Sequence, residues 1–242
     1  MSSTKVTDPN AKGSSGFLWA IVAVLIIAAV VVGFIVFRGQ SATVDRYAER
    51  DRTEVAAEAE YSDGAITLAA SGAPAGAEEV EIYEDYSCSY CADLAEQTDE
   101  RMLEEIEEGN VVVHLRPLNF LDQGSVGHST ESLAASLALI SRGEVEAYWN
   151  LREVMMEEQT EIYNQWGADD FADAAAGLGA SDEAVDAIRA EEHLDEAVEL
   201  AEGNASRLEE QTGSVSSPRI VQDGQAIAEQ DPTQWMNEVL GA

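Results

Sequence analysis

The chain has 242 residues, and its 13 lysines and arginines against 47 aspartates and glutamates give a formal net charge of −34 at pH 7. Nucleic-acid-binding proteins need a basic surface to displace counterions from phosphates, so this balance argues against DNA and RNA as partners. We expect the acidic surface to keep the protein soluble and monomeric through self-repulsion.

The N-terminal region contains one long apolar segment, residues 17–37, which carries no charge. At about 1.5 Å per residue, a helix of this length crosses the roughly 30 Å hydrocarbon core of a bilayer. The segment is longer than the apolar stretch of a cleaved signal peptide. It therefore predicts a retained transmembrane anchor that follows a cytoplasmic tail at residues 1–16.

Residues 38–63 alternate in charge, are rich in alanine and contain few large apolar side chains. This composition does not supply a hydrophobic core, so it predicts a stalk or linker. The remaining residues, 64–242, are numerous enough for one domain with a well-buried core.

The predicted domain at residues 64–242 begins with two strands and a helix. Residues 65–69 form the first strand and residues 80–83 the second, which leads directly to a pair of cysteines. Apolar residues then recur with helical spacing until Gly109, which suits a helix C-cap. A buried strand is predicted at residues 111–115.

The second half of the domain is mainly helical. We expect a helical insertion at about residues 125–208, with breaks near its glycines. A proline-led strand at residues 218–222 follows, and a turn connects it to a second short strand. The last helix is predicted at residues 231–240.

Cys88 and Cys91 are the only cysteines, and they stand where the first predicted helix begins. The free N–H groups and positive dipole end of a helix stabilise a thiolate, which predicts a lowered pKa and a nucleophilic role for Cys88. The same geometry places Cys91 in the first helical turn. Glu84, Asp85 and Asp93 are near in sequence and are expected to raise the pKa of Cys88 through like charge, but by less than the helix start lowers it.

Two other uses of the cysteine pair are open. A structural disulfide between residues three apart closes so small a loop that its chain-entropy stabilisation is slight. Zinc prefers three or four ligands, and His114, His128 and His193 have no ligand spacing to the cysteines. A copper carrier with two thiolates and one histidine is a further alternative, but we expect neither a metal nor another cofactor.

Aromatic residues mark two further candidate features. Residues 148–156 combine aromatic, aliphatic and methionine side chains at helical spacing, which favours a place in the core over a groove for unfolded clients. Tyr86, just before the cysteine pair, and Tyr90, beside Cys91, are candidates for an exposed apolar rim. For Arg116 and Pro117 we expect turn geometry and an ion pair, with no catalytic role.

Over roughly residues 65–242 the chain resembles the DsbA-like branch of the thioredoxin-fold oxidoreductases. The segments that carry the resemblance are GAITLAASGAPAGAEEVEIYEDYSCSYC, VVVHLRPLNFLD, SLAASLALISRGEVEAYWNLREVMMEEQ and TGSVSSPRIVQDG. They are similar to membrane-anchored or exported enzymes of Gram-positive and archaeal type. The resemblance implies an α/β thioredoxin fold with an inserted helical subdomain, here preceded by one N-terminal transmembrane helix.

The resemblance also implies which residues support the cysteine pair. Ser89 and Tyr90 lie between the cysteines, where the family commonly has proline first. Ser217 stands where the family often has threonine, and it precedes Pro218, whose peptide bond is expected to be cis and beside the disulfide. In such folds the backbone at Ser217 pairs with an extended client strand, and the two departures from the family pattern, between the cysteines and at Ser217, are expected to affect the redox potential and substrate contact.

Together these patterns predict an extracytoplasmic protein thiol-disulfide oxidoreductase. It would introduce disulfides into exported client proteins with free thiols, and a membrane redox partner would reset the Cys88–Cys91 pair. A redox pair behind one N-terminal anchor fits an oxidising compartment, whereas the four arginines between residues 38 and 52 favour the opposite orientation by the positive-inside rule. The alternatives are a reductase or isomerase of the same fold, or a non-enzymatic binding module or metallochaperone.

Overall fold

The computed structural model describes residues 14–72 and 76–241, and the chain divides after Ala42 into two compact units. The first unit contains the beginning of helix α1 (Ser14–Ala48), and the second contains the rest of the chain. Most of the predicted cytoplasmic tail lies outside the described residues. Within the described ranges no helix is both long enough and apolar enough to cross a membrane, so the anchor predicted at residues 17–37 is not confirmed.

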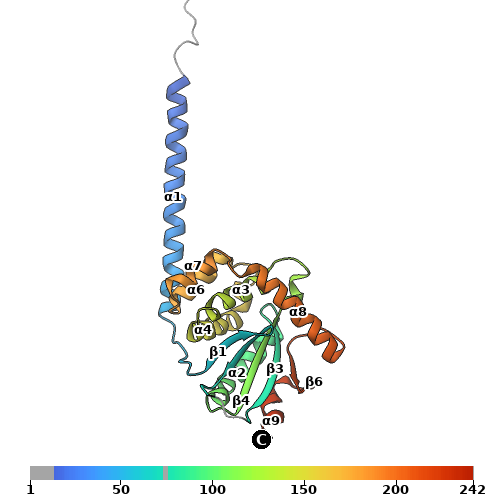
Figure 1. Cartoon of the computed structure of the whole chain (residues 1–242). Helices are drawn as coiled ribbons and strands as arrows, with labels where there is room; N and C mark the ends of the chain where they lie inside the picture. Colours follow the sequence, from blue (N-terminus) through green and yellow to red (C-terminus); the bar gives the residue numbers. More distant parts are fainter. Residues whose placement is uncertain (1–13, 73–75, 242) are drawn as a thin grey trace, which may run out of the picture. The chain divides into compact units, whose positions relative to one another are not determined.

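A six-stranded mixed sheet forms the centre of the second unit (Figure 1), with the strand order β1-β2-β4-β3-β5-β6. The strands are β1 (Glu58–Ser62), β2 (Ala65–Ala69), β3 (Glu78–Asp85), β4 (Val111–Leu118), β5 (Arg219–Gln222) and β6 (Gln225–Ile227). β3 and β4 are parallel, and all other neighbours are antiparallel. The predicted α/β class is therefore confirmed.

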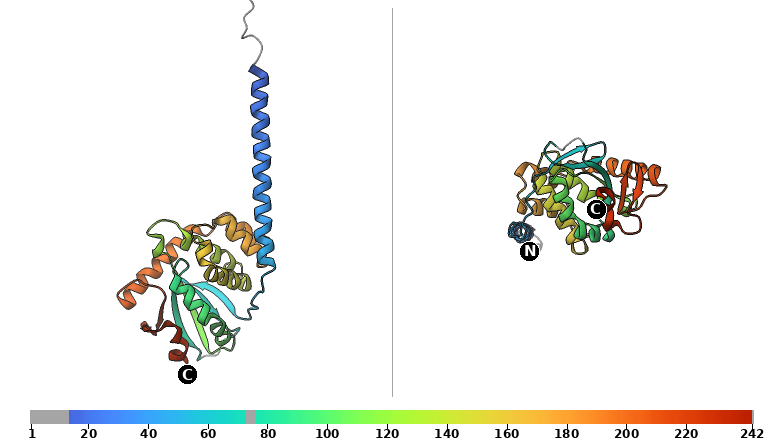
Figure 2. Two further views of the ribbon diagram at one scale, coloured as in Figure 1. Left: turned by 180° about the vertical axis from the view of Figure 1, so that it is seen from behind. Right: turned by 90° about the horizontal axis from the view of Figure 1, so that it is seen from below.

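The parallel pair β3 and β4 determines where the cysteines lie. Parallel neighbours need a crossover connection, and helix α2 (Ser89–Glu107) supplies it. Figure 2 shows α2 on the face of the sheet that is seen from behind. Because β3 ends at Asp85, the chain reaches Cys88 at the carboxyl end of a central strand, which is the edge where α/β proteins commonly place their sites.

Side chains of β3 alternate between the two faces of the sheet. Ile82 belongs to the main core beneath α2, whereas Tyr83 belongs to a smaller cluster on the other face. In that cluster Tyr83 is joined by Leu118, Val221 and Leu208, the last of which comes from the helical subdomain. Both faces of the central strand are thus covered.

Six helices between β4 and β5 form the helical subdomain, close to the predicted insertion at residues 125–208. They are α3 (His128–Ile140), α4 (Val145–Glu157), α5 (Gln159–Ile162), α6 (Ala168–Gly177), α7 (Asp182–Arg189) and α8 (Leu194–Thr212). All side chains of α3 except Glu131 are buried, although the first half of this helix is mostly polar. Three short helical segments complete the fold: η1 (Phe120–Asp122) before the subdomain, and η2 (Pro232–Gln234) and α9 (Trp235–Leu240) at the C-terminus.

Much of the range predicted as a stalk, residues 38–63, belongs to the folded unit. Residues 58–62 form β1, which pairs antiparallel with β2. Tyr47 is only 1% exposed, packs edge-to-face on Trp166 and donates from its hydroxyl to Glu158 at 2.8 Å. Composition does not reveal these contacts, because β1 is an edge strand without an apolar pattern and the packing on Trp166 is made by one aromatic side chain, Tyr47.

Gly177 provides a test of this packing. A Cβ atom added at Gly177 would lie 2.6 Å from the Val44 carbonyl oxygen and 2.8 Å from Tyr47 Cβ. We expect Gly177→Ala to lower the free energy of unfolding by about 1–3 kcal/mol, as overpacking does. Gly203→Ala in α8 is the matched control, because its Cβ would meet nothing within 4 Å, and its better helix propensity should add up to about 1 kcal/mol. Urea denaturation measures both variants. Equal effects would contradict the close packing of Val44 and Tyr47 against Gly177 of α6.

Candidate active site

Cys88 occupies the N-cap position of α2, with extended backbone angles of φ −90° and ψ 114°. Its N–H donates to the Asp85 carbonyl at 2.8 Å, and its own carbonyl accepts from the Cys91 N–H at 2.9 Å. These bonds turn the chain directly from β3 into the helix. Cys88 thus stands where the helix start was predicted, with Cys91 buried in the first turn and both present as free thiols.

The residues between the cysteines face outward. Ser89 is exposed, and the Tyr90 side chain is 72% exposed. Tyr86, which was predicted to share an exposed rim with Tyr90, is fully buried, and its hydroxyl lies 3.2 Å from Ser136 Oγ. The prediction for Tyr86 is therefore wrong, because an aromatic ring after a central strand reaches the interface with α3 rather than solvent.

The loop before β5 lies against the cysteines. The Ser217–Pro218 peptide bond is cis, in agreement with the expectation from the resemblance. Cys88 Sγ donates to the Ser217 carbonyl oxygen at 3.4 Å, although the two residues are 129 positions apart. Pro218 and Cys91 line one small cavity. The structure thus brings Ser217 and Pro218 to the redox pair.

The two sulfur atoms have opposite acidities. A hydrogen bond from the Cys91 thiol, aided by the Ser217 side chain and by the N–H groups of Cys91 and Tyr90, lowers the pKa of Cys88 to about 6 against the effect of burial. Burial is the main cause that raises the pKa of Cys91, and its neighbour Cys88 adds to the rise. At neutral pH the site therefore holds a thiolate at Cys88 and a thiol at Cys91.

The acidic residues expected to oppose the Cys88 thiolate are directed elsewhere. Both carboxylate oxygens of Glu84 accept from the guanidinium of Arg152, at 3.0 and 2.6 Å. The Asp85 carboxylate accepts from the Ser129 hydroxyl at 2.5 Å, and burial raises the pKa of Asp85 to about 6. Asp93 is exposed to solvent. Like-charge repulsion is therefore weaker than sequence proximity suggests.

Two residues of the helical subdomain support the site without having been predicted. Gln159 Nε2 donates to the carbonyl oxygens of Tyr86 at 2.7 Å and Cys88 at 3.2 Å, which fixes the turn before the cysteines. Arg152 is 2% exposed and pairs with Glu84 and Asp99. A signal for Arg152 was present, because a lone basic residue among the mostly apolar residues 148–156 needs a buried partner.

The other candidate residues make structural contacts outside the cysteine pair. The cluster in residues 148–156 is mostly buried in the core, which is the position that the sequence favoured. Arg116 forms the expected ion pair, with Glu81 at 2.7 Å. His114 contacts Thr67 and His193 contacts Glu196, both away from the cysteines, while His128 is buried beside Phe171 and Tyr163. The structure does not bring a histidine to the pair.

A helix-start thiolate, a buried thiol three residues later and a cis-proline loop together define a dithiol redox site. The thiolate can attack a disulfide sulfur, and the thiol can resolve the resulting mixed disulfide. The class of protein that the fold and this site define is a thiol-disulfide oxidoreductase.

Comparison with known proteins agrees with this class. The family model described as thioredoxin matches residues 65–240, and the chain belongs to this family. It is similar to the MdbA protein, a thiol-disulfide oxidoreductase from Corynebacterium diphtheriae, with 42% identity and a TM-score of 0.78 over 81% of this chain and 99% of that one. MdbA from Corynebacterium matruchotii is 36% identical with the same TM-score, over 82% and 99% of the two chains.

A more distant similarity concerns the fold alone. BdbD from Bacillus subtilis is 18% identical, with a TM-score of 0.56 over 78% of this chain and 97% of that one. None of the curated proteins matches the sequence. The similarity to the two MdbA proteins establishes that the chain is an enzyme of the thiol-disulfide oxidoreductase class.

The lowered pKa of Cys88 predicts a pH-dependent stability. Between pH about 6 and about 8.5, the unfolded chain keeps the Cys88 proton while the folded chain has lost it. Unfolding of the reduced protein then takes up a proton, so its free energy of unfolding rises with pH, by at most about 3 kcal/mol in total. The oxidised protein has no thiol there and lacks this slope.

Thermal denaturation of the reduced and oxidised proteins across this pH window measures the effect. As pH rises, the melting temperature of the reduced protein should increase relative to that of the oxidised protein. The Cys88→Ser variant, which has no ionising group at this position, should show no such shift under reducing conditions. A difference that stays constant with pH would mean that the folded protein does not lower the pKa of Cys88.

Proposed function

We propose that this enzyme introduces disulfides into exported proteins outside the cytoplasm, with Cys88 and Cys91 as its redox pair. The observation that carries the proposal is the contrast between a Cys88 thiolate with a pKa of about 6 and a buried Cys91 thiol. Stabilising the thiolate stabilises the reduced protein, which makes the disulfide a stronger oxidant. This favours an oxidase over a reductase of the same fold.

The reaction begins when a client thiolate attacks Cys88 Sγ in the oxidised enzyme. The new sulfur–sulfur bond joins the client to Cys88, and Cys91 leaves as a thiolate that takes up a proton because burial raises its pKa. A second client thiolate then attacks the client sulfur of the mixed disulfide. Cys88 leaves as its stable thiolate, and the client has lost two electrons and two protons.

The loop at Ser217 is the place where we expect the client to bind. The Ser217 carbonyl oxygen lies 3.4 Å from the sulfur that is attacked, and the loop leads directly into β5. An extended client segment beside Ser217 would bring its cysteine in line with Cys88. Tyr90, between the two cysteines and 72% exposed, offers an apolar contact to the same segment.

The proposed compartment follows from the chemistry. Disulfides formed by such an enzyme persist only in an oxidising environment, and the pair needs a redox partner that accepts its two electrons. We propose a partner in the membrane for this step. An anchor at residues 17–37 is a prediction from the sequence, and the proposed reaction does not depend on it.

The two single-cysteine variants test the division of labour. Cys88→Ser should abolish oxidation of a reduced, unfolded client protein, because the nucleophilic position is lost. Cys91→Ser should instead accumulate mixed disulfides with the client, because the resolving thiol is missing. Thiol loss of the reduced client measures the first effect, and non-reducing gels of the full-length variants incubated with an oxidised client measure the second. Equal loss of activity in both variants without a trapped complex would contradict the assignment.

A further inference from the structure

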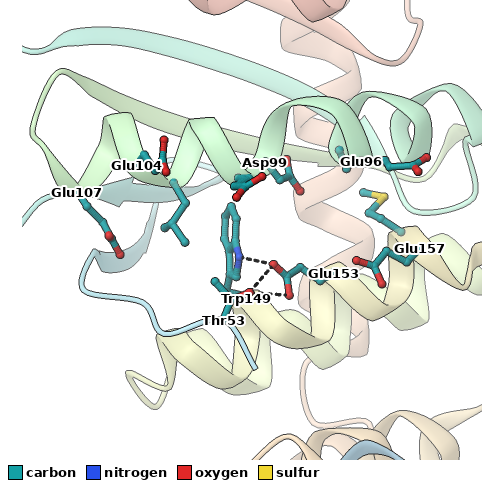
Figure 3. A pocket seen from close by; sticks show the side chains of 12 residues that line it. Thr53, Glu96, Asp99, Glu104, Glu107, Trp149, Glu153 and Glu157 are labelled. Carbon is teal, nitrogen blue, oxygen red and sulfur yellow. Dashed lines mark hydrogen bonds between the residues drawn. The ribbon is translucent and has the colours of Figure 1, made fainter. Parts of the chain in front are cut away.

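A groove of about 450 Å³ runs between helices α2 and α4, on the side of α2 that faces the helical subdomain (Figure 3). Its floor is apolar and its rims carry carboxylates. The floor consists of Ala95, Leu103, Trp149 and Met156. We call this feature the acidic groove.

One end of the acidic groove lies about one helical turn beyond Cys91 along α2. Ala95, one helical turn after Cys91, lines both the groove and the small cavity at Cys91. Figure 3 shows Glu96 and Glu157 towards one end and Glu107 at the other. At about 1.5 Å per residue, the groove follows α2 for roughly 16 Å, which is enough for about five residues of an extended chain.

Several of the acidic side chains in the groove are bound within the protein. Asp99 pairs with Arg152, as described above. Glu153 accepts from Trp149 Nε1 at 2.9 Å and from the Thr53 hydroxyl at 3.0 Å, contacts drawn in Figure 3. These carboxylates are therefore part of the folded structure rather than a surface for a partner.

Three other carboxylates have no such role. Glu96, Glu100 and Glu104 are exposed, line the groove and have no hydrogen-bond or ion-pair partner for their side chains among the residues that the structure describes. They follow one another at four-residue spacing, where like charges destabilise a helix. A cationic partner would relieve this repulsion and bury the apolar floor at the same time.

The spacing of the three carboxylates indicates the form of the partner. Four residues of an α-helix rise about 6 Å, which is close to the roughly 6.6 Å between alternate residues of an extended chain. An extended segment with basic side chains at alternate positions therefore places one cation at each glutamate. Its intervening side chains face the other way, and apolar residues there can pack on Trp149 and Leu103.

We propose that the acidic groove binds an extended client segment that has lysine or arginine at alternate positions and apolar residues between them. This inference rests on the proposed function, because the bound segment would deliver a client cysteine to Cys88 from the adjoining end of the groove. A second copy of this chain is a poor occupant, because its net charge is −34. The groove would thus select basic clients and increase their rate of oxidation.

Binding can be tested without any redox reaction. The probe is a synthetic peptide without cysteine that alternates lysine with valine, compared with the same peptide carrying glutamine in place of lysine. The test variant of the full chain is Glu96→Gln, Glu100→Gln and Glu104→Gln together. Its matched control is Glu199→Gln, Glu202→Gln and Glu210→Gln, which removes as many exposed charges from α8.

Calorimetric titration should show that the wild-type protein prefers the lysine peptide and that the groove variant binds it about tenfold more weakly, a few-fold for each exposed ion pair. The α8 variant should bind as the wild type does. An equal loss in both variants would show that only net charge matters and would overturn the proposal. Wild-type protein that does not distinguish the lysine peptide from the glutamine peptide would overturn it as well.

A second measurement separates this proposal from the proposed function. With one cysteine added at an end of each peptide, two peptide molecules reduce one enzyme disulfide and become a disulfide-linked dimer; oxidised wild-type enzyme should oxidise the lysine peptide in this way about tenfold faster than the glutamine peptide, and the groove variant should lose that difference. Binding with no oxidation of either peptide would contradict the oxidase function and leave the groove in place. Oxidation of both peptides at equal rates would contradict client selection by the groove but would remain consistent with the oxidase function.

The stability of the groove variant provides an independent check that it is folded. Removing like charges at four-residue spacing should raise its melting temperature slightly above that of the wild type. A higher melting temperature combined with weaker peptide binding would show that the three glutamates serve binding at a cost in stability. A lower melting temperature would contradict the claim that they lack partners in the free protein.

Discussion

The stabilisation of one thiolate at the first turn of α2 is the interaction on which the rest of the site depends. The first N–H groups of a helix have no partners within the helix, and here they lie at Cys88. The hydrogen bond from the Cys91 thiol contributes most to the lowered pKa of Cys88, and burial keeps the proton on Cys91 itself. This contrast between two chemically identical side chains supports the proposed roles of Cys88 as nucleophile and Cys91 as resolving thiol.

The fold brings three separate parts of the chain to this helix start. Parallel pairing of β3 with β4 requires the α2 crossover and places Cys88 at the end of a central strand. The loop before β5 supplies the Ser217 carbonyl, and Gln159 of the helical subdomain holds the Cys88 carbonyl. The inserted helices are therefore part of the active site rather than an addition to its periphery.

A buried charge cluster connects the same elements beneath the surface. Arg152 of α4 binds Glu84 of β3 and Asp99 of α2. Removing one member of such a cluster leaves an uncompensated buried charge, which costs roughly 3–5 kcal/mol. Arg152 also neutralises the Glu84 carboxylate, four residues before Cys88. The acidic residues before Cys88 therefore repel its thiolate less.

Much of this arrangement could be predicted from the sequence. The features that could not be predicted have one physical cause in common. Strand β2, the start of α2 and the turn after β5 follow local patterns of apolar residues, cysteines and glycine, and they appear where expected. The burial of Tyr47 and Tyr86 and the contact made by Gln159 depend on packing between distant segments. A single aromatic or amide side chain carries no periodic signal, so its partner becomes known only from the tertiary structure.

The reduction potential of the Cys88–Cys91 pair tests the central claim most directly. The full-length protein can be equilibrated with glutathione buffers of defined poise and its thiol content measured. A stabilised thiolate predicts a potential between about −120 and −180 mV, the range of oxidising dithiol proteins. A value near the roughly −270 mV of thioredoxin would show that the thiolate is not stabilised enough to favour oxidation of clients, and would contradict the account.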